Sequence, residues 1–290
     1  MSIQTYHQPL VDFEKKKDFF IGVDSDGCVF DSMELKHKEC FCPAFIGTFG
    51  LQGVSTWARE VWEKVNLYSR SRGVNRFLAL QKALRILAND PRVAERGVQV
   101  PPLDGLGLWI QESDSLDMVN LGQRIEKTAD PDLCQVWEWS TQVNRAIKEI
   151  VRGLPPLPAA RHALEVISRQ ADLMVVSQSP EVDLNREWEE YGIHPYPSLI
   201  AGQELGTKAE HLAYGARGKY KREKILMIGD APGDLKAAKH SEVAFYPIIP
   251  GRENESWVRF LNEGMDRFFT GTFRGPYEEG LIREFEAVLS

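Results

Sequence analysis

The amino-acid sequence predicts an α/β protein with a parallel-sheet core and an inserted all-helical domain. Five short apolar segments are rich in branched or aromatic residues and bounded by turn formers, which is typical of strands buried on both faces. Helix-like segments alternate with the later ones, and this alternation favours right-handed crossovers and a parallel sheet. The expected strands are 19–23, 173–176, 198–201, 225–228 and 243–246, and the expected helices are 159–169, 182–191, 209–216 and 233–239.

The stretch between the first two expected strands has no convincing strand pattern. Apolar residues recur there at helical spacing in three segments. These segments are 57–69, 74–88 and 131–151. The last has Asp130 placed as its N-cap, Pro131 at the first helical position and Gly153 just past its end. We therefore expect an all-helical domain inserted into the α/β core.

Two domains follow from these patterns. Residues 1–32 and 152–290 are expected to form the core, which is discontinuous in sequence, and residues 33–151 the helical domain. The segment 154–158, Leu-Pro-Pro-Leu-Pro, is the expected return linker. The tail from residue 257 to residue 290 is rich in aromatic residues, and we expect it to pack one or two helices onto the core.

Composition excludes several classes of protein. The chain has 290 residues, enough for one core and a smaller satellite domain, and its net charge of −7 argues against a nucleic-acid partner. Residues 1–20 lack the features of a signal peptide, and the longest apolar runs are short of the ~20 residues that a membrane helix needs. The four cysteines are too few for a disulfide framework. We expect a soluble cytoplasmic protein, and the sequence does not indicate its oligomeric state.

Polar residues follow four of the expected strands. They are Asp24 and Asp26 after the first strand, Ser177 after the second, Lys208 after the third, and Asp230 and Asp234 after the fourth. Each alone has an ordinary interpretation as a turn residue, a helix cap or a solvated lysine. Because ligands of parallel sheets bind outside the carboxyl ends of the strands, the convergence of all of them on one edge favours a functional site.

These residue types fit the transfer of a phosphoryl group to a carboxylate. A phosphate monoester carries close to two negative charges, and a divalent cation together with a lysine ammonium can offset the repulsion of an attacking carboxylate. Oxygen-rich ligands favour magnesium over softer metals. A serine hydroxyl and backbone N–H groups can hold the phosphate oxygens, and a second carboxylate can serve as acid and then as base.

The same residues, in this order, resemble the motifs of the haloacid dehalogenase-like hydrolases. Asp24 and Asp26 match the first motif (DxD), Ser177 the second, Lys208 the third, and Asp230 with Asp234 the fourth (GDxxxD). The resemblance covers about residues 19–32 and 155–250. It implies a Rossmann-like core with a helical cap of the first type, a nucleophile at Asp24 and a general acid/base at Asp26. The helical cap is longer than in most phosphoglucomutase-like relatives, and the chain continues well past the core.

The resemblance also implies a cofactor and its ligands. Mg²⁺ would be held by Asp24, the Asp26 carbonyl and Asp230, with Asp234 as a supporting or direct acid. Ser177 and Lys208 would complete the catalytic set. The expected phosphate-binding residues are Ser25, Ser177, Gln178 and Lys208. Relatives that cleave carbon–halogen bonds usually lack an acid at the position of Asp26, so its presence favours phosphoryl transfer.

The predicted function is a magnesium-dependent phosphatase that hydrolyses a small phosphorylated metabolite through an aspartyl-phosphate. A phosphomutase of the same family is the alternative within enzymes. A non-enzymatic phosphate- or metal-binding module is a further alternative, which the presence of every catalytic residue type disfavours.

Three arginines, Arg70, Arg72 and Arg76, surround an expected turn in the helical domain. Arginine suits the forked geometry of carboxylates and phosphates, so these side chains could bind an anionic group of a substrate. Solvation, or pairing with acids of the same domain, is the interpretation that we favour.

Overall fold

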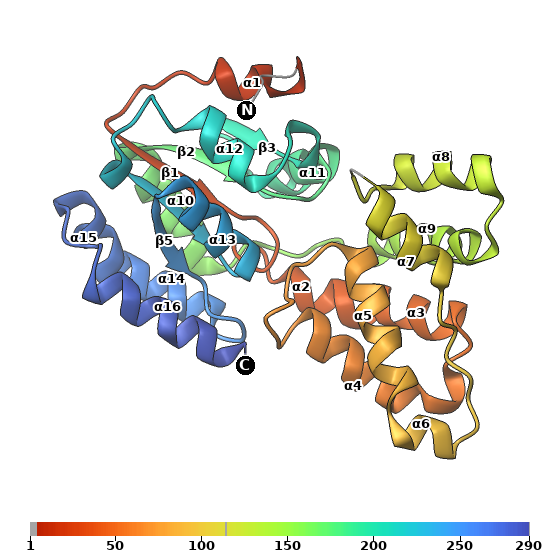
Figure 1. The fold of residues 1–290 in the computed structure, drawn as a ribbon. Helices are drawn as coiled ribbons and strands as arrows, with labels where there is room; N and C mark the ends of the chain where they lie inside the picture. Colours follow the sequence, from red (N-terminus) through yellow and green to blue (C-terminus); the bar gives the residue numbers. More distant parts are fainter. Residues whose placement is uncertain (1–4, 114, 290) are drawn as a thin grey trace. The chain divides into compact units, whose positions relative to one another are not determined.

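The computed structural model describes residues 5–113 and 115–289, so the parts of the predicted domains at residues 1–4, 114 and 290 lie outside the described residues. The chain divides into two compact units. We call Met1–Ser32 with Leu154–Ser290 the core unit, and Met33–Gly153 the helical unit. Figure 1 shows the helices and strands of both, coloured along the chain.

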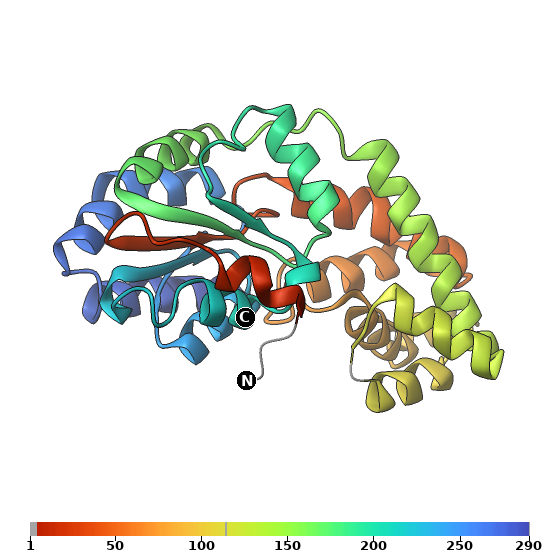
Figure 2. The same cartoon turned by 90° about the horizontal axis from the view of Figure 1, so that it is seen from above.

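A five-stranded parallel sheet forms the centre of the core unit, as the sequence predicts (Figures 1 and 2). The strands are β1 (Phe19–Val23), β2 (Ala171–Val176), β3 (Leu199–Ala201), β4 (Ile225–Gly229) and β5 (Ala244–Pro247). Their order is β3-β2-β1-β4-β5, so β1 pairs with both β2 and β4. The chain adds strands on one side of β1 and then on the other, which makes the boundary between β1 and β4 the topological switch point of the sheet.

Helices bury both faces of the sheet, and this explains why the strands are continuous apolar runs. Ile21 points into an apolar cluster shared with α10, α14 and α15, whereas the neighbouring Phe20 points into a cluster shared with α1, α12 and α13. These helices are α1 (Gln8–Val11), α10 (Pro158–Gln170), α12 (Lys208–Gly215), α13 (Pro232–Ser241), α14 (Glu253–Arg259) and α15 (Met265–Thr270), while α11 (Glu181–Glu190) follows β2. The predicted strands and helices of the core are confirmed, with ends that differ by at most two residues.

The C-terminal tail contributes more helix than the sequence suggested. In the described residues it forms α14, α15 and α16 (Pro276–Val288), with a π-helical turn at Phe260–Gly264. Trp257, Phe260 and Phe268 are buried in the cluster on one sheet face. The helix α16 lies along the edge strand β5, where Glu278 accepts a hydrogen bond of 2.8 Å from the Phe245 N–H. This contact uses a backbone donor of the sheet edge that would otherwise stay open.

The helical unit is built around buried tryptophans. Trp62, Trp109 and Trp139 are almost fully buried in an apolar cluster of this unit. Its α-helices are α2 (Ser32–Leu35), α3 (Cys42–Thr48), α4 (Ser55–Asn66), α5 (Arg76–Ala88), α6 (Pro91–Glu95), α7 (Asp104–Glu112), α8 (Met118–Thr128) and α9 (Pro131–Ile150). The three predicted helices correspond to α4, α5 and α9, and Asp130 caps α9 by accepting from the Asp132 and Leu133 N–H groups.

No helix in the described ranges is both long enough and apolar enough to cross a membrane.

One buried histidine makes the stability of the core unit sensitive to acid. His211, in α12, is fully buried, and burial lowers its pKa from 6.5 to about 4, helped by the positive charge of Lys208 and opposed by Glu210. The folded state therefore keeps His211 neutral between these two pH values, while the unfolded chain takes up a proton. The contribution of this group to stability is lost as the pH falls from about 6.5 towards 4.

We predict that this group alone lowers the free energy of unfolding by about 2 kcal/mol between pH 8 and pH 5. Urea unfolding of the wild type and of His211→Gln at both pH values measures it. The wild type should lose more stability than the variant over this interval by that amount. Equal losses in the two proteins would show that His211 does not titrate in this way.

Candidate active site

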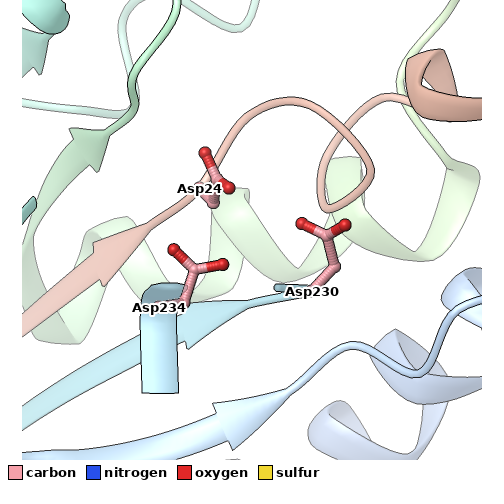
Figure 3. Close-up of side chains that lie close together, drawn as sticks. All are labelled: Asp24, Asp230 and Asp234. Carbon is pink, nitrogen blue, oxygen red and sulfur yellow. The ribbon is translucent and has the colours of Figure 1, made fainter. Parts of the chain in front are cut away.

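Three buried carboxylates gather beyond the carboxyl ends of β1 and β4, at the switch point of the sheet (Figure 3). Asp24 follows β1 directly, and its N–H donates a 2.9 Å hydrogen bond to the Ile228 carbonyl of β4. Asp230 follows β4, and Asp234 lies in the first turn of α13. Pairing of the two central strands therefore fixes where the first two of these acids leave the sheet.

The three carboxylates are close enough to share one cation. One oxygen from each of Asp24, Asp230 and Asp234 lies within 4.8 Å of the others. Their exposed fractions are 6%, 1% and 0%, so water cannot screen their mutual repulsion well. Such a group of acids is stable only with compensating positive charge.

Lys208 supplies part of that charge. Its Nζ lies 2.5 Å from Asp24 Oδ2 and 2.5 Å from Asp234 Oδ1. Burial alone would lower the pKa of Lys208, but the two carboxylates outweigh burial and raise it. The lysine is therefore held as a cation between two acids.

A single lysine does not neutralise the cluster. Burial raises the pKa of Asp24 to about 7, because the attraction of Lys208 only partly offsets desolvation and Asp234 adds repulsion. Burial also raises the pKa of Asp234, with a further contribution from Asp230. Both shifts mean that ionised carboxylates are disfavoured here unless more positive charge arrives.

A divalent cation fits this requirement. The donors are all carboxylate oxygens, which suit Mg²⁺ or Ca²⁺ rather than a softer metal. Asp234 already accepts hydrogen bonds at both oxygens, one from Lys208 and one of 3.0 Å from the Ala231 N–H. Asp24 likewise accepts at both oxygens, from Lys208 and from the Ser25 N–H at 2.8 Å. A cation at this cluster would therefore compete with or replace hydrogen bonds at either acid, and these bonds do not distinguish direct ligands from a supporting acid.

Asp26 lies outside the carboxylate cluster, in the loop that follows β1. Its side chain is half-buried and accepts hydrogen bonds from Ser32 and, at 2.6 Å, from Ser179. Gly27, at φ +72°, turns the chain immediately after it, and a side chain there would be strained. Two hydroxyl groups therefore orient the Asp26 carboxyl group, one from Ser32 at the start of α2 and one from Ser179 in the segment after β2.

The residues expected to bind phosphate occupy three different environments. Ser177 is buried, and its Oγ accepts from the Ser179 N–H. Gln178 is exposed, and its amide donates to the carbonyls of Ser177 and Gly206, which ties the second motif to the loop before Lys208.

The side chain of Ser25 is fully buried, and its Oγ accepts a 3.0 Å hydrogen bond from the Trp188 indole. The hydroxyl is therefore committed to Trp188. The Ser25 N–H donates a 2.8 Å hydrogen bond to Asp24 Oδ1, so in this structure Ser25 supports Asp24.

Sequence reasoning missed several residues that hold the site together. Ser179 was not singled out, although it lies two residues after Ser177. Thr207 and Glu210 form a capping box that fixes the start of α12, and the pattern Thr-x-x-Glu was a readable signal for it. Trp188 gave no signal, because its contact with the catalytic loop depends on the tertiary fold.

Comparison with known proteins identifies the fold. No protein-family model and no curated protein matches the sequence. Among solved structures, a predicted phosphoglycolate phosphatase from Lactobacillus delbrueckii subsp. bulgaricus aligns with 85% of this chain and 91% of its own, at 16% identity and a TM-score of 0.50. This chain has the haloacid dehalogenase-like fold. At this identity the likeness concerns the fold alone.

Two further structures resemble the chain more weakly. A subfamily IA hydrolase of the haloacid dehalogenase superfamily from Geobacter sulfurreducens aligns with 81% of this chain and 89% of its own, at 15% identity and a TM-score of 0.41. A haloacid dehalogenase-like hydrolase from Bacillus subtilis, described as bound to magnesium, covers 79% of this chain and 86% of its own, at 16% identity and a TM-score of 0.42.

We predict that Mg²⁺ stabilises the folded protein through the carboxylate cluster. At a concentration well above its dissociation constant, the ion should raise the free energy of unfolding by about 1–3 kcal/mol, measured as a shift of the thermal midpoint. Asp230→Asn should be more stable than the wild type without metal, because one repelling charge is gone, and should gain little from Mg²⁺.

Asp26→Asn is the matched control, because its side chain is not part of the cluster, and it should respond to Mg²⁺ like the wild type. Equal stabilisation of the wild type and Asp230→Asn would contradict a metal site at these carboxylates.

Proposed function

We propose that the protein is a magnesium-dependent phosphatase that hydrolyses a small phosphorylated metabolite through an aspartyl-phosphate at Asp24. The observation that carries the proposal is the position of Asp24: a buried carboxylate at the end of a central parallel strand, 2.5 Å from a lysine and clustered with two more acids. The haloacid dehalogenase-like fold is consistent with this chemistry, but the argument for function rests on the site.

In the first step, a carboxylate oxygen of Asp24 attacks phosphorus and the bond from phosphorus to the leaving oxygen breaks. Asp26 gives its proton to that oxygen, which leaves as an alcohol. In the second step, water attacks phosphorus and the bond to Asp24 breaks. Asp26 takes the proton from the water, inorganic phosphate is released, and Asp24 is restored.

The remaining residues lower the electrostatic cost of these steps. Mg²⁺, held by Asp24, Asp230 and the Asp26 carbonyl, would supply positive charge to the phosphate oxygens. Lys208 adds a fixed ammonium on the other side of Asp24, and Asp234 keeps that ammonium in place. Ser177 and Gln178 are the proposed contacts for the remaining oxygens of the phosphate, and Ser25 supports the nucleophile through its N–H bond to Asp24.

Phosphate release from an aryl phosphate tests the proposal. We predict release that requires Mg²⁺, stops with a chelator, and falls about 10³-fold or more in Asp24→Asn, because an amide cannot serve as the nucleophile. Circular dichroism of the variant checks that the fold is kept.

A panel of phosphorylated metabolites, with and without a bisphosphate activator, separates the alternatives. A phosphomutase would require the activator and release little phosphate. If no compound reacted under either condition, a binding module would replace the enzyme in this proposal.

The helical unit offers one candidate for substrate recognition, Arg76, which has neutral partners where an acid was one of the expected partners. Arg70 is exposed, as expected. Arg76 is half-buried at the first position of α5. Its Nη1 donates to Ser140 Oγ (3.1 Å) and to Asn144 Oδ1 (2.7 Å), and its guanidinium lies over the Phe41 ring. Among the described residues no carboxylate pairs with Arg76. Its two hydrogen bonds there both come from Nη1, and its Nε and Nη2 groups donate to no acceptor in that part of the chain.

A cation at the start of a helix is disfavoured by the helix dipole, so the position of Arg76 does not stabilise α5. The unused Nε and Nη2 donors form the edge of the guanidinium that binds carboxylates and phosphates in bidentate fashion. We propose that the helical unit acts as a cap and that Arg76 binds a second anionic group of the substrate.

We predict that Arg76→Gln raises KM about tenfold or more for phosphorylated substrates that carry a second anionic group. It should leave KM unchanged for an aryl phosphate whose aryl group is uncharged, because that substrate has no second anionic group for the arginine. Arg85→Gln is the matched control, since Arg85 is an exposed arginine of the same helix. A uniform rise of KM for all substrates would contradict the assignment.

A further inference from the structure

The C-terminal tail makes a direct hydrogen bond to the loop that follows β1. The Trp257 indole, in α14, donates to the Cys28 carbonyl at 2.7 Å. Trp257 and Cys28 are both fully buried. A buried carbonyl without a donor is destabilising. This bond therefore satisfies a carbonyl to which no backbone N–H in the described part of the chain donates.

The loop itself is a tight turn held by a few backbone hydrogen bonds. The Ser25 carbonyl accepts from the N–H groups of Val29 (2.9 Å) and Phe30 (3.1 Å), and the Gly27 N–H donates to the Phe30 carbonyl at 2.8 Å. Cys28 lies at the tip of this turn, two residues after Asp26. Fixing the Cys28 carbonyl therefore fixes the side of the turn that carries Asp26.

The helix α14 is hydrogen-bonded to the sheet, and this fixes the position of Trp257 relative to the loop after β1. Ser256 Oγ accepts a 3.0 Å hydrogen bond from the Ile249 N–H just after β5, and the Tyr246 hydroxyl of β5 donates to the Ser256 carbonyl at 2.7 Å. Trp257 also packs edge-on against Phe260. The tryptophan thus connects the edge of the sheet to the loop after its central strand.

Asp24 has supports of its own that do not involve this contact. It is held by the pairing of β1 with β4 and by Lys208. Asp26 lies beyond the strand, and its position depends on the turn and on the hydroxyl groups of Ser32 and Ser179. A loosened turn would therefore displace Asp26 more than Asp24.

We propose that Trp257 is a positioning residue for proton transfer: through the Cys28 carbonyl, the C-terminal tail holds Asp26 in line with the leaving oxygen. This inference rests on the proposed phosphatase function and gives the tail a role in it. Trp257 touches neither Asp26 nor substrate, and it acts through the geometry of the turn.

The dependence on the leaving group tests this role. An alkyl phosphate needs a proton on its leaving oxygen, whereas the phenolate of an activated aryl phosphate leaves with little help. Trp257→Phe keeps an aromatic ring but removes the indole donor. We predict that it lowers kcat/KM about tenfold for the alkyl phosphate and less than about threefold for the aryl phosphate.

Two variants calibrate this result. Asp26→Asn should show the same preference in stronger form, because it removes the acid itself. Trp139→Phe makes the same chemical change at a fully buried tryptophan whose indole has no hydrogen-bond partner in the described part of the chain, so it should show no preference. An equal loss on both substrates in Trp257→Phe, or no loss on either, would overturn the proposal.

A second readout does not depend on activity. Hydrogen exchange at the amides of Gly27, Val29 and Phe30 should be faster in Trp257→Phe than in the wild type and unchanged in Trp139→Phe. If the wild type hydrolysed neither ester, the proposed function would fail, while exchange would still decide whether Trp257 orders the turn. Unchanged exchange in Trp257→Phe would overturn the positioning role.

A milder variant covers the case in which Trp257→Phe does not fold. Ser256→Ala removes one anchor of α14 and keeps the indole. Compared with Trp257→Phe, this variant should show a smaller increase in the rate of amide exchange. It should also show a smaller loss of kcat/KM on the alkyl phosphate relative to the aryl phosphate. No shift in a folded Ser256→Ala protein, together with a Trp257→Phe protein that does not fold, would count against the proposal.

Discussion

The placement of Lys208 between Asp24 and Asp234 is the interaction on which the rest of the site depends. All three groups are largely buried, so none is well solvated, and each is tolerable only because the others are present. The lysine offsets part of the negative charge and leaves enough to attract a cation. Removal of its ammonium would leave two carboxylates in a buried place without their counter-charge.

The sheet makes this arrangement possible by bringing distant parts of the chain to one edge. Asp24 leaves β1 and Asp230 leaves β4, two adjacent strands that are far apart in sequence. The capping box of Thr207 and Glu210 starts α12 at Lys208. Supports from outside the sheet then hold the loop after β1, with Trp188 bonded to Ser25 and Trp257 to Cys28.

Much of this could be predicted because it depends on local patterns. Apolar runs that end in acids revealed both the strands and the residues at their ends, and Asp130 with Pro131 marked the start of α9. The hydrogen bonds of Trp188 and Trp257 could not be predicted, since in sequence both read as ordinary apolar helix positions. The neutral partners of Arg76 depend on how α5 and α9 pack, which periodicity alone does not fix. Short helices such as α6 have too few turns to show a period.

The discontinuous core also constrains how the chain folds during synthesis. Phe20 of β1 lies opposite Ile225 of β4, so the first strand cannot complete its pairing until most of the chain has left the ribosome. The helical unit is continuous in sequence and can fold before β4 has been synthesised and can pair with β1. During that interval an apolar strand has open edges and is exposed to wrong partners, which makes this the period in which a chaperone would matter most.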